Sequence, residues 1–459
     1  MNLSGLIPLI RTLPTYRETL ALISGHDSDE GHVTALALPR SARPAVLAAM
    51  IEDLKRPHLV LTAHIDRARV LQQETLAWNP ECQLKLFAEP NVFHYHRAPR
   101  GLRPICQRLE TLAMFSRRNV GAGSGAVSSA RALMMPTLPQ PEFHAHSQSL
   151  RTGERVRLQK LVSDCTYTGY ALRTMVSAPG ECSRRGGIVD IWPPTDKLPT
   201  RIELFGDEIE SMRRFDPSTQ RSCEEVEAVH LPPAREVLPG AGPDAAHALA
   251  QGWPESDPED ALAEHRADFE RLASGVIFPE LEYYLPWLHP EGGTLLDYLP
   301  KRCLIIIENW QTFVSEVHEF EQRGLQLRDE QVGAHTLPAD APAASTSWSE
   351  LQDQLSTRPL LLLAGADHEP DCDLGADFAP SRRHGGQIKS LLDYLEKLVL
   401  REKNTVVVSR QAVRIAELWN AHTYASSDVV TESTVKTDDV STIFSAGSTP
   451  VFVQGALAE

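Results

Sequence analysis

Long hydrophobic runs are missing from this sequence. No apolar stretch approaches the roughly 18–20 residues that a membrane-spanning helix needs. The N-terminus, MNLSGLIPLIRTLPTY, has one short apolar patch but neither the basic start nor the small-residue cleavage site of a secretion signal. We therefore expect no membrane partner and a cytoplasmic location.

Cysteine is scarce and irregularly spaced. The seven cysteines are scattered along the chain, and no C-x-x-C pair occurs. This spacing argues against both a zinc ribbon and a disulfide framework. A reducing compartment fits the pattern best.

Positive charge is in deficit. The 45 Lys and Arg residues stand against 61 Asp and Glu, which leaves a formal net charge of −16. Because affinity for nucleic acid comes mainly from basic side chains on phosphates, this balance argues against the chain wrapping nucleic acid by itself. A local basic cluster is then more informative than the average composition.

A phosphate-binding loop is absent from the place where an α/β sheet would carry one. The G-x-x-x-x-G-K-[ST] loop holds phosphates with backbone N–H groups and a lysine. The matching stretch, ALALPRSARPAVLAAM, has no glycine, and its two prolines remove N–H donors. The glycines of GAGSGAV (121–127) have the wrong spacing, and this run is predicted to be a flexible surface loop. We expect no cofactor in this chain. The degenerate loop comprises Pro39, Arg40, Ser41, Ala42, Arg43 and Pro44.

Metal-binding and catalytic motifs are also lacking. The pairs His94/His96 and His144/His146 could each hold a metal on a strand, but neither has a Cys or carboxylate at ligand spacing. The acidic run 367–377 lacks the closing Glu of a calcium loop. Neither G-x-S-x-G nor H-E-x-x-H occurs. We predict no metal site and no catalytic residue.

Alternating strand and helix patterns predict an α/β fold with a parallel, doubly wound sheet. Apolar runs at 56–64 and 301–310 predict strands, and 43–55 has the pattern of an amphipathic helix. Closely spaced strands near Gly206-Asp207, a favourable hairpin turn, predict a small α+β insert. The predicted domains are 1–140 and 234–332 for the first α/β domain, 141–233 for the insert, and 346–459 for a further α/β domain after a linker at 333–347. The last strand pattern ends at Glu459, as expected for part of a longer protein.

A basic edge precedes one strand of the insert. The stretch SRRGGIVDIWPP (183–194) places Arg184 and Arg185 before two glycines and an apolar run. In the next strand, TRIELFG, period-two alternation puts Ile202 and Leu204 on one face and Arg201, Glu203 and Phe205 on the other. Phe beside Arg is typical of an interface hot spot, where Phe is buried and Arg binds a carboxylate. Arg213 and Arg214 of the following strand could extend the patch. The alternative is a solvated charged face, in which these arginines pair with Glu203, Asp207, Glu208 and Glu210.

The stretch GECSRRGGIVDIWPP…LPTRIELFGDEIESMRRFDPSTQRSCEEVEAVHLPPAREVLP (180–239) resembles the UvrB-homology module of the bacterial transcription-repair coupling factors. In that family a G-E-x-x-x-R-G strand leads to a P-x-R-[IL]-[ED]-x-F hairpin, followed by F-D-x-x-[ST]-Q-R and E-E-V-E-A segments. Weaker likeness extends in both directions, through LPRSARPAVLAAMIEDLKRPHLVL, FPELEYYLPWLHPEGGTLLDYLP and VVVSRQAVRIAELW. Gly206 and the doubled Arg184-Arg185 depart from the common family forms.

The resemblance implies a fold and a partner. It implies a degenerate RecA/helicase-like α/β domain, an inserted UvrA-binding α+β domain and a further α/β domain. It also implies an adaptor that recruits UvrA. The family protein binds RNA polymerase and double-stranded DNA, and carries a translocating motor with ATP and Mg, in a part beyond this chain. The alternatives are a UvrB-like DNA-dependent ATPase and a scaffold whose charged hairpin binds nothing. The implied UvrA-binding residues are Arg185, Arg201 and Phe205, extended by Arg184 and Arg213.

Overall fold

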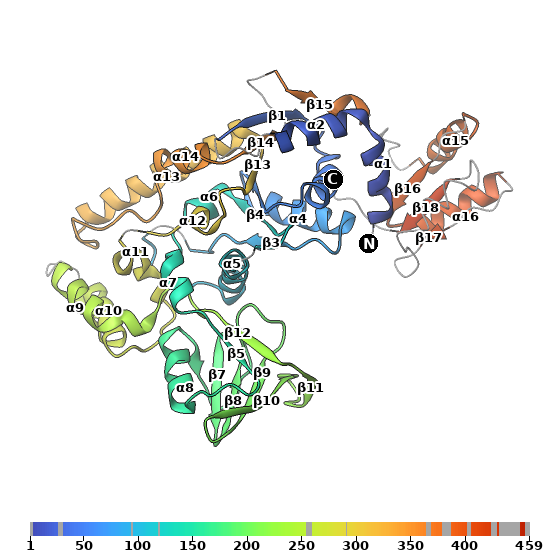
Figure 1. The fold of residues 1–459 in the computed structure, drawn as a ribbon. Helices are drawn as coiled ribbons and strands as arrows, with labels where there is room; N and C mark the ends of the chain where they lie inside the picture. Colours follow the sequence, from blue (N-terminus) through green and yellow to red (C-terminus); the bar gives the residue numbers. More distant parts are fainter. Residues whose placement is uncertain are drawn as a thin grey trace.

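Figure 1 shows the computed structural model, which describes residues 3–25, 31–92, 95–117, 120–253, 259–290, 292–363, 369–378, 387–401, 405–423, 429–430 and 450–454. These residues form sheets of seven, six, two and three strands. Among the helices of the described ranges, none has the length and apolar character that crossing a membrane requires.

The first domain is built on the parallel seven-stranded sheet, in the order β15-β1-β14-β13-β2-β4-β3. Its central strands are mostly apolar because both faces of the sheet are covered. Leu59 and Leu61 of β2 pack into the core on one face, and Val60 between them packs into the core on the other. The strands are β1 (Val33–Ala37), β2 (His58–Thr62), β3 (Leu84–Phe87), β4 (Gly125–Ser129), β13 (Leu304–Glu308), β14 (Leu360–Leu363) and β15 (Cys372–Asp373).

Helices cover both faces of this sheet (Figure 1). One face packs against α1 (Ile7–Thr12), α2 (Pro14–Gly25), α3 (Arg43–Leu54) and α4 (Ile65–Trp78). The other packs against α5 (Leu102–Phe115), α6 (Ala130–Met134), α7 (Gln140–Ala145), α12 (Leu295–Tyr298), α13 (Trp310–Gly333) and α14 (Trp348–Ser356). A separate aromatic core around Tyr284 holds α9 (Gly242–Gly252), α10 (Glu259–Ala273) and α11 (Leu285–Leu288). The predicted α/β class with a parallel sheet is confirmed.

The insert, residues 148–231, contains a six-stranded sheet in the order β11-β10-β9-β8-β7-β6. Helix α8 (Leu158–Tyr167) and the antiparallel pair β5 (Gln148–Arg151) and β12 (Ala228–Leu231) complete it. Leu161 of α8 and Ile202 of the sheet are fully buried in its core. The strands are β6 (Ala171–Leu172), β7 (Glu181–Arg185), β8 (Ile188–Ile191), β9 (Thr200–Phe205), β10 (Glu208–Phe215) and β11 (Ser222–Glu225).

A third unit lies at the C-terminal end of the described chain. Its parallel sheet has the order β16-β18-β17, formed by β16 (Val406–Ser409), β17 (Val429–Val430) and β18 (Val451–Gln454). Helices α15 (Ile388–Val399) and α16 (Ala412–Thr423) pack over Phe452.

The structure corrects the predicted start of this last unit at residue 346. Strand β14 pairs in parallel with β1 on one side and β13 on the other, so it lies inside the seven-stranded sheet. Helix α14 packs into the same domain through Leu351 and Leu355. Its start at Ser347 is fixed by a capping box with Glu350. The Pro- and Ala-rich stretch 333–347 is therefore a connection within the first domain, because a parallel strand needs a long crossover from its predecessor.

The structure of the run GAGSGAV (121–127) also differs from the predicted surface loop. Ser124 to Val127 are buried, and Gly125 begins β4. A Cβ atom on Gly125 would lie 1.9 Å from Nε2 of the buried His58 ring. Glycine is required at 125 by close packing, so the prediction of a flexible surface loop is wrong for 124–127, whereas Gly121 and Ala122 are exposed in a turn.

Candidate partner-binding site

Two tight hairpin turns lie together at one end of the insert sheet. Gly186, with φ of 60°, and Gly187 join β7 to β8, and Gly206, with φ of 63°, and Asp207 join β9 to β10. Both turns need left-handed backbone, which glycine adopts without strain. Gly187 also lies close to β9, because its carbonyl accepts a hydrogen bond from the Leu204 N–H at 2.9 Å.

The β9–β10 turn is held in place from outside the hairpin. The N–H of Val156 donates to the carbonyl of Asp207 at 2.7 Å, and the N–H of Ile209 donates to the carbonyl of Glu154 at 2.9 Å. The segment before α8 therefore braces the turn. Phe205, directly before it, is 81% exposed. A large apolar side chain on a fixed backbone is preorganised for contact with a partner.

The strand register decides which basic residues share the face of Phe205. Arg185 pairs across to Ile188, which pairs to Glu203 of β9, and cross-strand partners lie on the same face. Arg184 pairs with Val189, which is fully buried in the core. We call the outer face the side of the sheet that carries Arg185, Arg201, Glu203, Phe205 and Arg213. Arg184 lies on the opposite side, so the two neighbouring arginines cannot form one patch.

Arg201 is committed to contacts within the insert. Its Nε and Nη2 donate to the two carboxylate oxygens of Asp190 at 2.8 and 2.9 Å. Its guanidinium carbon lies 4.7 Å from the ring centroid of the buried Phe215. The hydrogen bonds with Asp190 raise the pKa of Arg201 above its ordinary value. The middle of the outer face is thus occupied by an internal ion pair whose Arg side chain is only 19% exposed.

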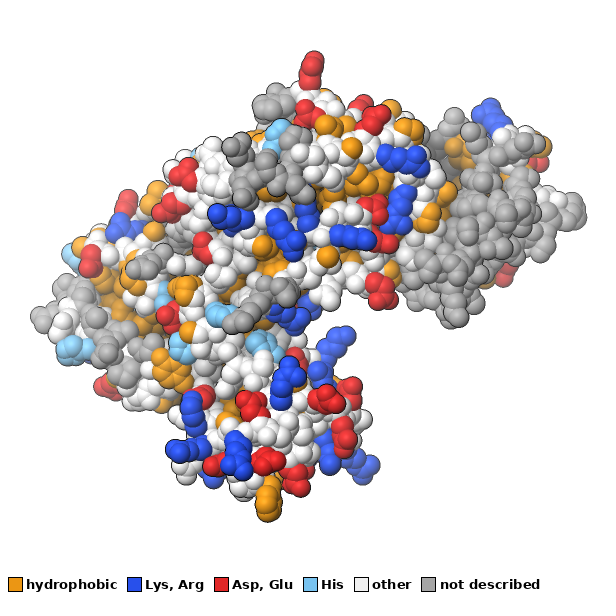
Figure 2. Space-filling model, viewed as in Figure 1, with side chains coloured by type: hydrophobic (Ala, Val, Ile, Leu, Met, Phe, Trp, Pro, Cys, Tyr) orange, Lys and Arg blue, Asp and Glu red, His pale blue; other side chains and the backbone are white. Residues whose placement is uncertain are grey.

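The end of the outer face is more open. Arg185 is exposed and donates one hydrogen bond, to the Thr174 carbonyl at 3.2 Å. Arg213 lies further from the turns, with Nε 3.3 Å from a Glu225 carboxylate oxygen. Figure 2 shows basic and acidic side chains mixed over the insert, with hydrophobic surface projecting at its lower end. Of the predicted residues, Arg185 and Phe205 share this face at its open end, on strands separated by β8.

Replacing Arg201 with alanine is expected to destabilise the insert. The change leaves Asp190, which is 2% exposed, without the donors of its bidentate pair. Loss of hydrogen bonds to a charged buried group costs about 1.5–3 kcal/mol. Urea denaturation measures this loss. The matched control is Arg185→Ala, an exposed change expected to stay within about 0.5 kcal/mol of wild type; equal effects of the two changes would contradict the assigned roles.

The degenerate loop forms a turn and the start of α3. Pro44 occupies one of the first two positions of that helix, where it offers no N–H. Arg43 is buried, and its Nη1 lies 2.8 Å from a carboxylate oxygen of Glu308, the last residue of β13. Arg67 of α4 binds the same carboxylate through Nε and Nη2, at 2.8 and 2.6 Å. Burial raises the pKa of Glu308, but the contacts with Arg67 and Arg43 outweigh burial and lower it. An internal ion-pair cluster therefore lies at the carboxyl end of this central strand.

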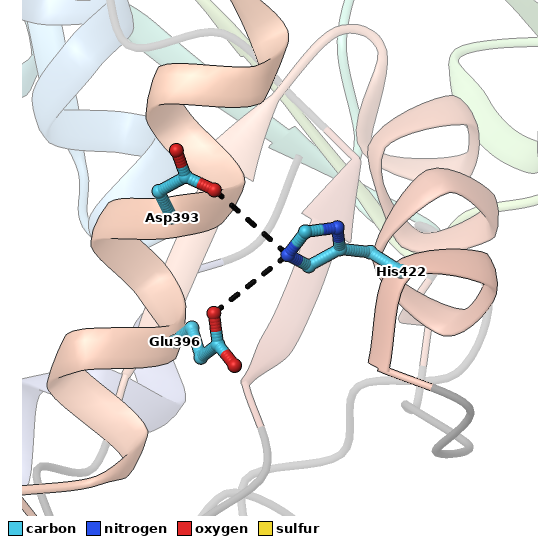
Figure 3. A group of neighbouring side chains, drawn as sticks. All are labelled: Asp393, Glu396 and His422. Atoms are coloured by element: carbon cyan, nitrogen blue, oxygen red, sulfur yellow. Dashed lines mark ion pairs between the residues drawn. The ribbon is translucent and has the colours of Figure 1, made fainter.

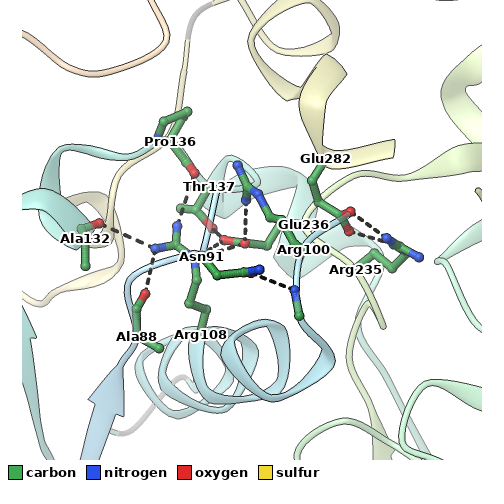
Figure 4. A network of polar contacts seen from close by, with 11 residues as sticks. Ala88, Asn91, Arg100, Arg108, Ala132, Pro136, Thr137, Arg235, Glu236 and Glu282 are labelled. Atoms are coloured by element: carbon green, nitrogen blue, oxygen red, sulfur yellow. Dashed lines mark hydrogen bonds and ion pairs between the residues drawn. The ribbon is translucent and has the colours of Figure 1, made fainter. Parts of the chain in front are cut away.

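A buried network joins the insert to the first domain (Figure 4). Glu236 follows β12 and has no exposed surface. It accepts hydrogen bonds from Nε of Arg108 at 2.8 and 2.9 Å, from the Thr137 hydroxyl at 2.6 Å, and from Arg100 at 3.1 Å. The neighbouring Arg235 makes a bidentate pair with Glu282 at 2.6 and 2.5 Å. These pairs hold the segment in which the chain returns from the insert.

The histidine pairs do not form ligand sets among the described residues. His146 stacks on Tyr167 at 5.2 Å and contacts the Glu142 carbonyl at 2.9 Å, whereas His144 is exposed. His94, and Asp367 and His368 at the start of the acidic run 367–377, lie outside the described residues. The only group of three potential ligands in the described chain is Asp393, Glu396 and His422, which the sequence analysis did not identify.

The fold and the insert define a class of protein: a parallel α/β domain that carries an inserted sheet domain with an exposed aromatic hairpin. Residues 149–237 match the sequence model of the UvrB interaction domain family. The resemblance predicted from the motifs is thereby confirmed for this part of the chain.

Similarity to known proteins extends beyond the insert. The chain is 29% identical over 297 residues to the transcription-repair-coupling factor of Bacillus subtilis, covering 62% of this chain and 25% of that protein. With the Escherichia coli transcription-repair-coupling factor it shares 26% identity over 402 residues, covering 86% of this chain and 33% of the relative. The Haemophilus influenzae protein of the same name is 31% identical over 186 residues, 39% of this chain and 16% of that protein.

The chain thus resembles part of the transcription-repair coupling factors and spans about a third or less of the length of these curated relatives. Among solved structures, the Sulfolobus solfataricus SWI2/SNF2 ATPase core in complex with double-stranded DNA matches 96% of this chain and 77% of that chain. Its TM-score is 0.17 and its identity 9%, too low to support an argument about fold or function.

Proposed function

We propose that this chain is the adaptor part of a transcription-repair coupling factor and that its insert recruits UvrA, the damage-sensing protein of nucleotide excision repair. The match of residues 149–237 to the UvrB interaction domain family supports this proposal. The observation that carries it is Phe205, which is 81% exposed on a hairpin braced by the segment before α8.

The chemistry of the open end suits an acidic protein surface. Phe205 supplies apolar area for burial, and Arg185 on the same face supplies forked donors for a carboxylate. Residues 149–237 hold 13 Lys and Arg against 14 Asp and Glu, so the insert is nearly neutral within a chain of net charge −16. The insert therefore meets less long-range repulsion from an acidic partner than the rest of the chain does.

Competition with UvrB tests the proposed partner. If the insert uses the surface implied by its family, the chain and UvrB compete for one site on UvrA. We expect unlabelled chain to displace fluorescent UvrB from UvrA in an anisotropy titration. A ternary complex of all three proteins, or no displacement by folded chain, would contradict the proposal.

In this proposal, other parts of such a factor bind RNA polymerase and double-stranded DNA. The translocating motor, with its ATP and Mg, also lies in those parts. This chain then acts without catalysis. The alternative is a UvrB-like ATPase. The ion pairs of Glu308 with Arg43 and Arg67 argue against it, because they engage the basic groups that a nucleotide phosphate would need.

Thermal unfolding with and without Mg-ATP separates these two functions. A ligand at a hundredfold excess over its Kd stabilises a protein by about 2.7 kcal/mol. We expect millimolar Mg-ATP to leave the Tm of this chain unchanged, relative to the same concentration of Mg-sulfate. A clear rise in Tm, lost on Arg43→Ala substitution, would favour the ATPase.

A further inference from the structure

Two helices of the third unit bring three potential metal ligands together (Figure 3). Asp393 and Glu396 lie on α15, and His422 lies in the last turn of α16. Nε2 of His422 is 3.9 Å from an Asp393 carboxylate oxygen and 3.7 Å from a Glu396 carboxylate oxygen. The imidazole points between the two carboxylates, and both face it from the opposite helix.

The core of the unit fixes this arrangement. On α15, Leu392 and Leu395 are buried and hold the helix against the sheet. Asp393 and Glu396 are their next neighbours, so a rotation of about 100° places both at the border of the buried stripe. On α16, Trp419 is buried, and His422 follows it by three residues on the same stripe. The three side chains therefore meet where the two helices adjoin, not on independent loops.

The distances suit coordination of one cation. With metal–nitrogen and metal–oxygen bonds of about 2.1–2.2 Å, separations of 3.7 and 3.9 Å subtend about 120–130° at the metal, slightly wider than tetrahedral. Helical bundles hold metals with carboxylates and histidines that project from facing helices, including ligands three residues apart on one helix, and this cluster has the same kinds of donor. A nitrogen ligand among oxygens favours zinc and its first-row neighbours over Mg²⁺ or Ca²⁺, which take oxygen alone.

We propose that Asp393, Glu396 and His422 form a binding site for a divalent transition-metal cation, with Zn²⁺ as the best fit. The side chains of the three residues are 48%, 52% and 33% exposed, so the cation can enter from solvent and keep water on its remaining positions. A bound cation replaces two long ion pairs by three bonds and ties the C-terminal end of α16 to α15. This proposal does not depend on the UvrA interaction.

The test of the site is a calorimetric titration of Zn²⁺ into the whole chain, in a buffer that does not chelate metals. We expect one Zn²⁺ per chain to be bound by the wild type and lost in both His422→Ala and Asp393→Asn. The second variant is nearly isosteric and guards against a local folding defect. The matched control is His144→Ala, which removes another exposed histidine and should leave the stoichiometry unchanged.

Cobalt gives an independent readout of the same site. Co²⁺ bound in a near-tetrahedral site absorbs visible light strongly, and we expect this band in the wild type and not in His422→Ala. Zn²⁺ should also raise the Tm of the wild type without affecting that of the variant. If the wild type and His422→Ala bind Zn²⁺ equally, the cluster is an ordinary pair of histidine–carboxylate contacts and the proposal is wrong.

Discussion

Replacing Glu236 with alanine is expected to lower the free energy of unfolding by about 3–5 kcal/mol, the usual cost of removing one partner from a buried ion pair. Glu236 has no exposed surface, and Arg108, its main partner, is also fully buried. The change leaves that guanidinium with no anionic partner among Ala88, Ala132 and Pro136, whose carbonyls accept its remaining hydrogen bonds, the nearest being Pro136 at 3.1 Å. Urea denaturation of the wild type and the variant measures the difference.

An exposed ion pair is the control for this result. Glu110 of α5 binds Lys85 at 2.8 Å with both side chains partly exposed, and Glu110→Ala should cost about 1 kcal/mol or less. Equal effects at Glu110 and Glu236 would show that the buried network does not hold the return from the insert to the first domain.

The contribution of Glu236 should also depend on pH. Burial raises its pKa, but the charges of Arg108 and Arg100 and the Thr137 hydrogen bond outweigh burial and lower it below the ordinary value of 4.5. A lowered folded pKa gives stability that is complete above the unfolded value and is lost as pH falls through the folded value. The stability difference between the wild type and Glu236→Gln should therefore be constant above about pH 5 and shrink in more acidic solution.

Replacing Phe205 with alanine is expected to weaken binding to UvrA by about 30-fold or more, since truncating a central aromatic residue of an interface costs about 2 kcal/mol or more. Because Phe205 is 81% exposed in the free chain, its removal should leave urea denaturation within about 0.5 kcal/mol of wild type. At Phe205 the substitution should weaken binding without lowering stability, whereas at Arg201 it should lower both.

Two comparisons sharpen the Phe205 prediction. Leu325→Ala removes another exposed hydrophobic side chain, 55% exposed on α13, and should not change the affinity for UvrA. Arg201→Ala should weaken binding only together with a loss of insert stability, because its guanidinium is bound to Asp190. If Phe205→Ala binds UvrA as tightly as wild type, the open end of the outer face is not the interface.

Local patterns predicted the elements of the insert well. Alternation in β9 correctly placed Ile202 in the core and Phe205 on the outside, since it depends only on the strand's own residues. The pairing of Arg201 with Asp190 was not predictable in this way, because it depends on the register between β8 and β9. Arg184 and Arg185 are neighbours on β7 and therefore face opposite sides of the sheet, although the sequence analysis placed them in one patch. The register decides only that Arg185 is the one on the face of Phe205.

Long-range pairing accounts for the main error in the fold. The apolar run at 360–363 reads as a strand, but the sequence does not show that it lies between β1 and β13. The Pro- and Ala-rich segment before it then looked like a domain linker. The Glu236 network and the Asp393, Glu396 and His422 cluster were missed for a related reason. In each case residues of separate elements come together, and no short motif connects them.

Calorimetric titration of this chain into purified UvrA tests the central claim most directly. The account predicts saturable binding by the wild type and, under the same conditions, at least a 30-fold weaker affinity for Phe205→Ala, whose urea denaturation matches that of the wild type. An absence of binding by the folded wild-type chain would contradict the proposed function, and equal binding by both proteins would contradict the proposed site.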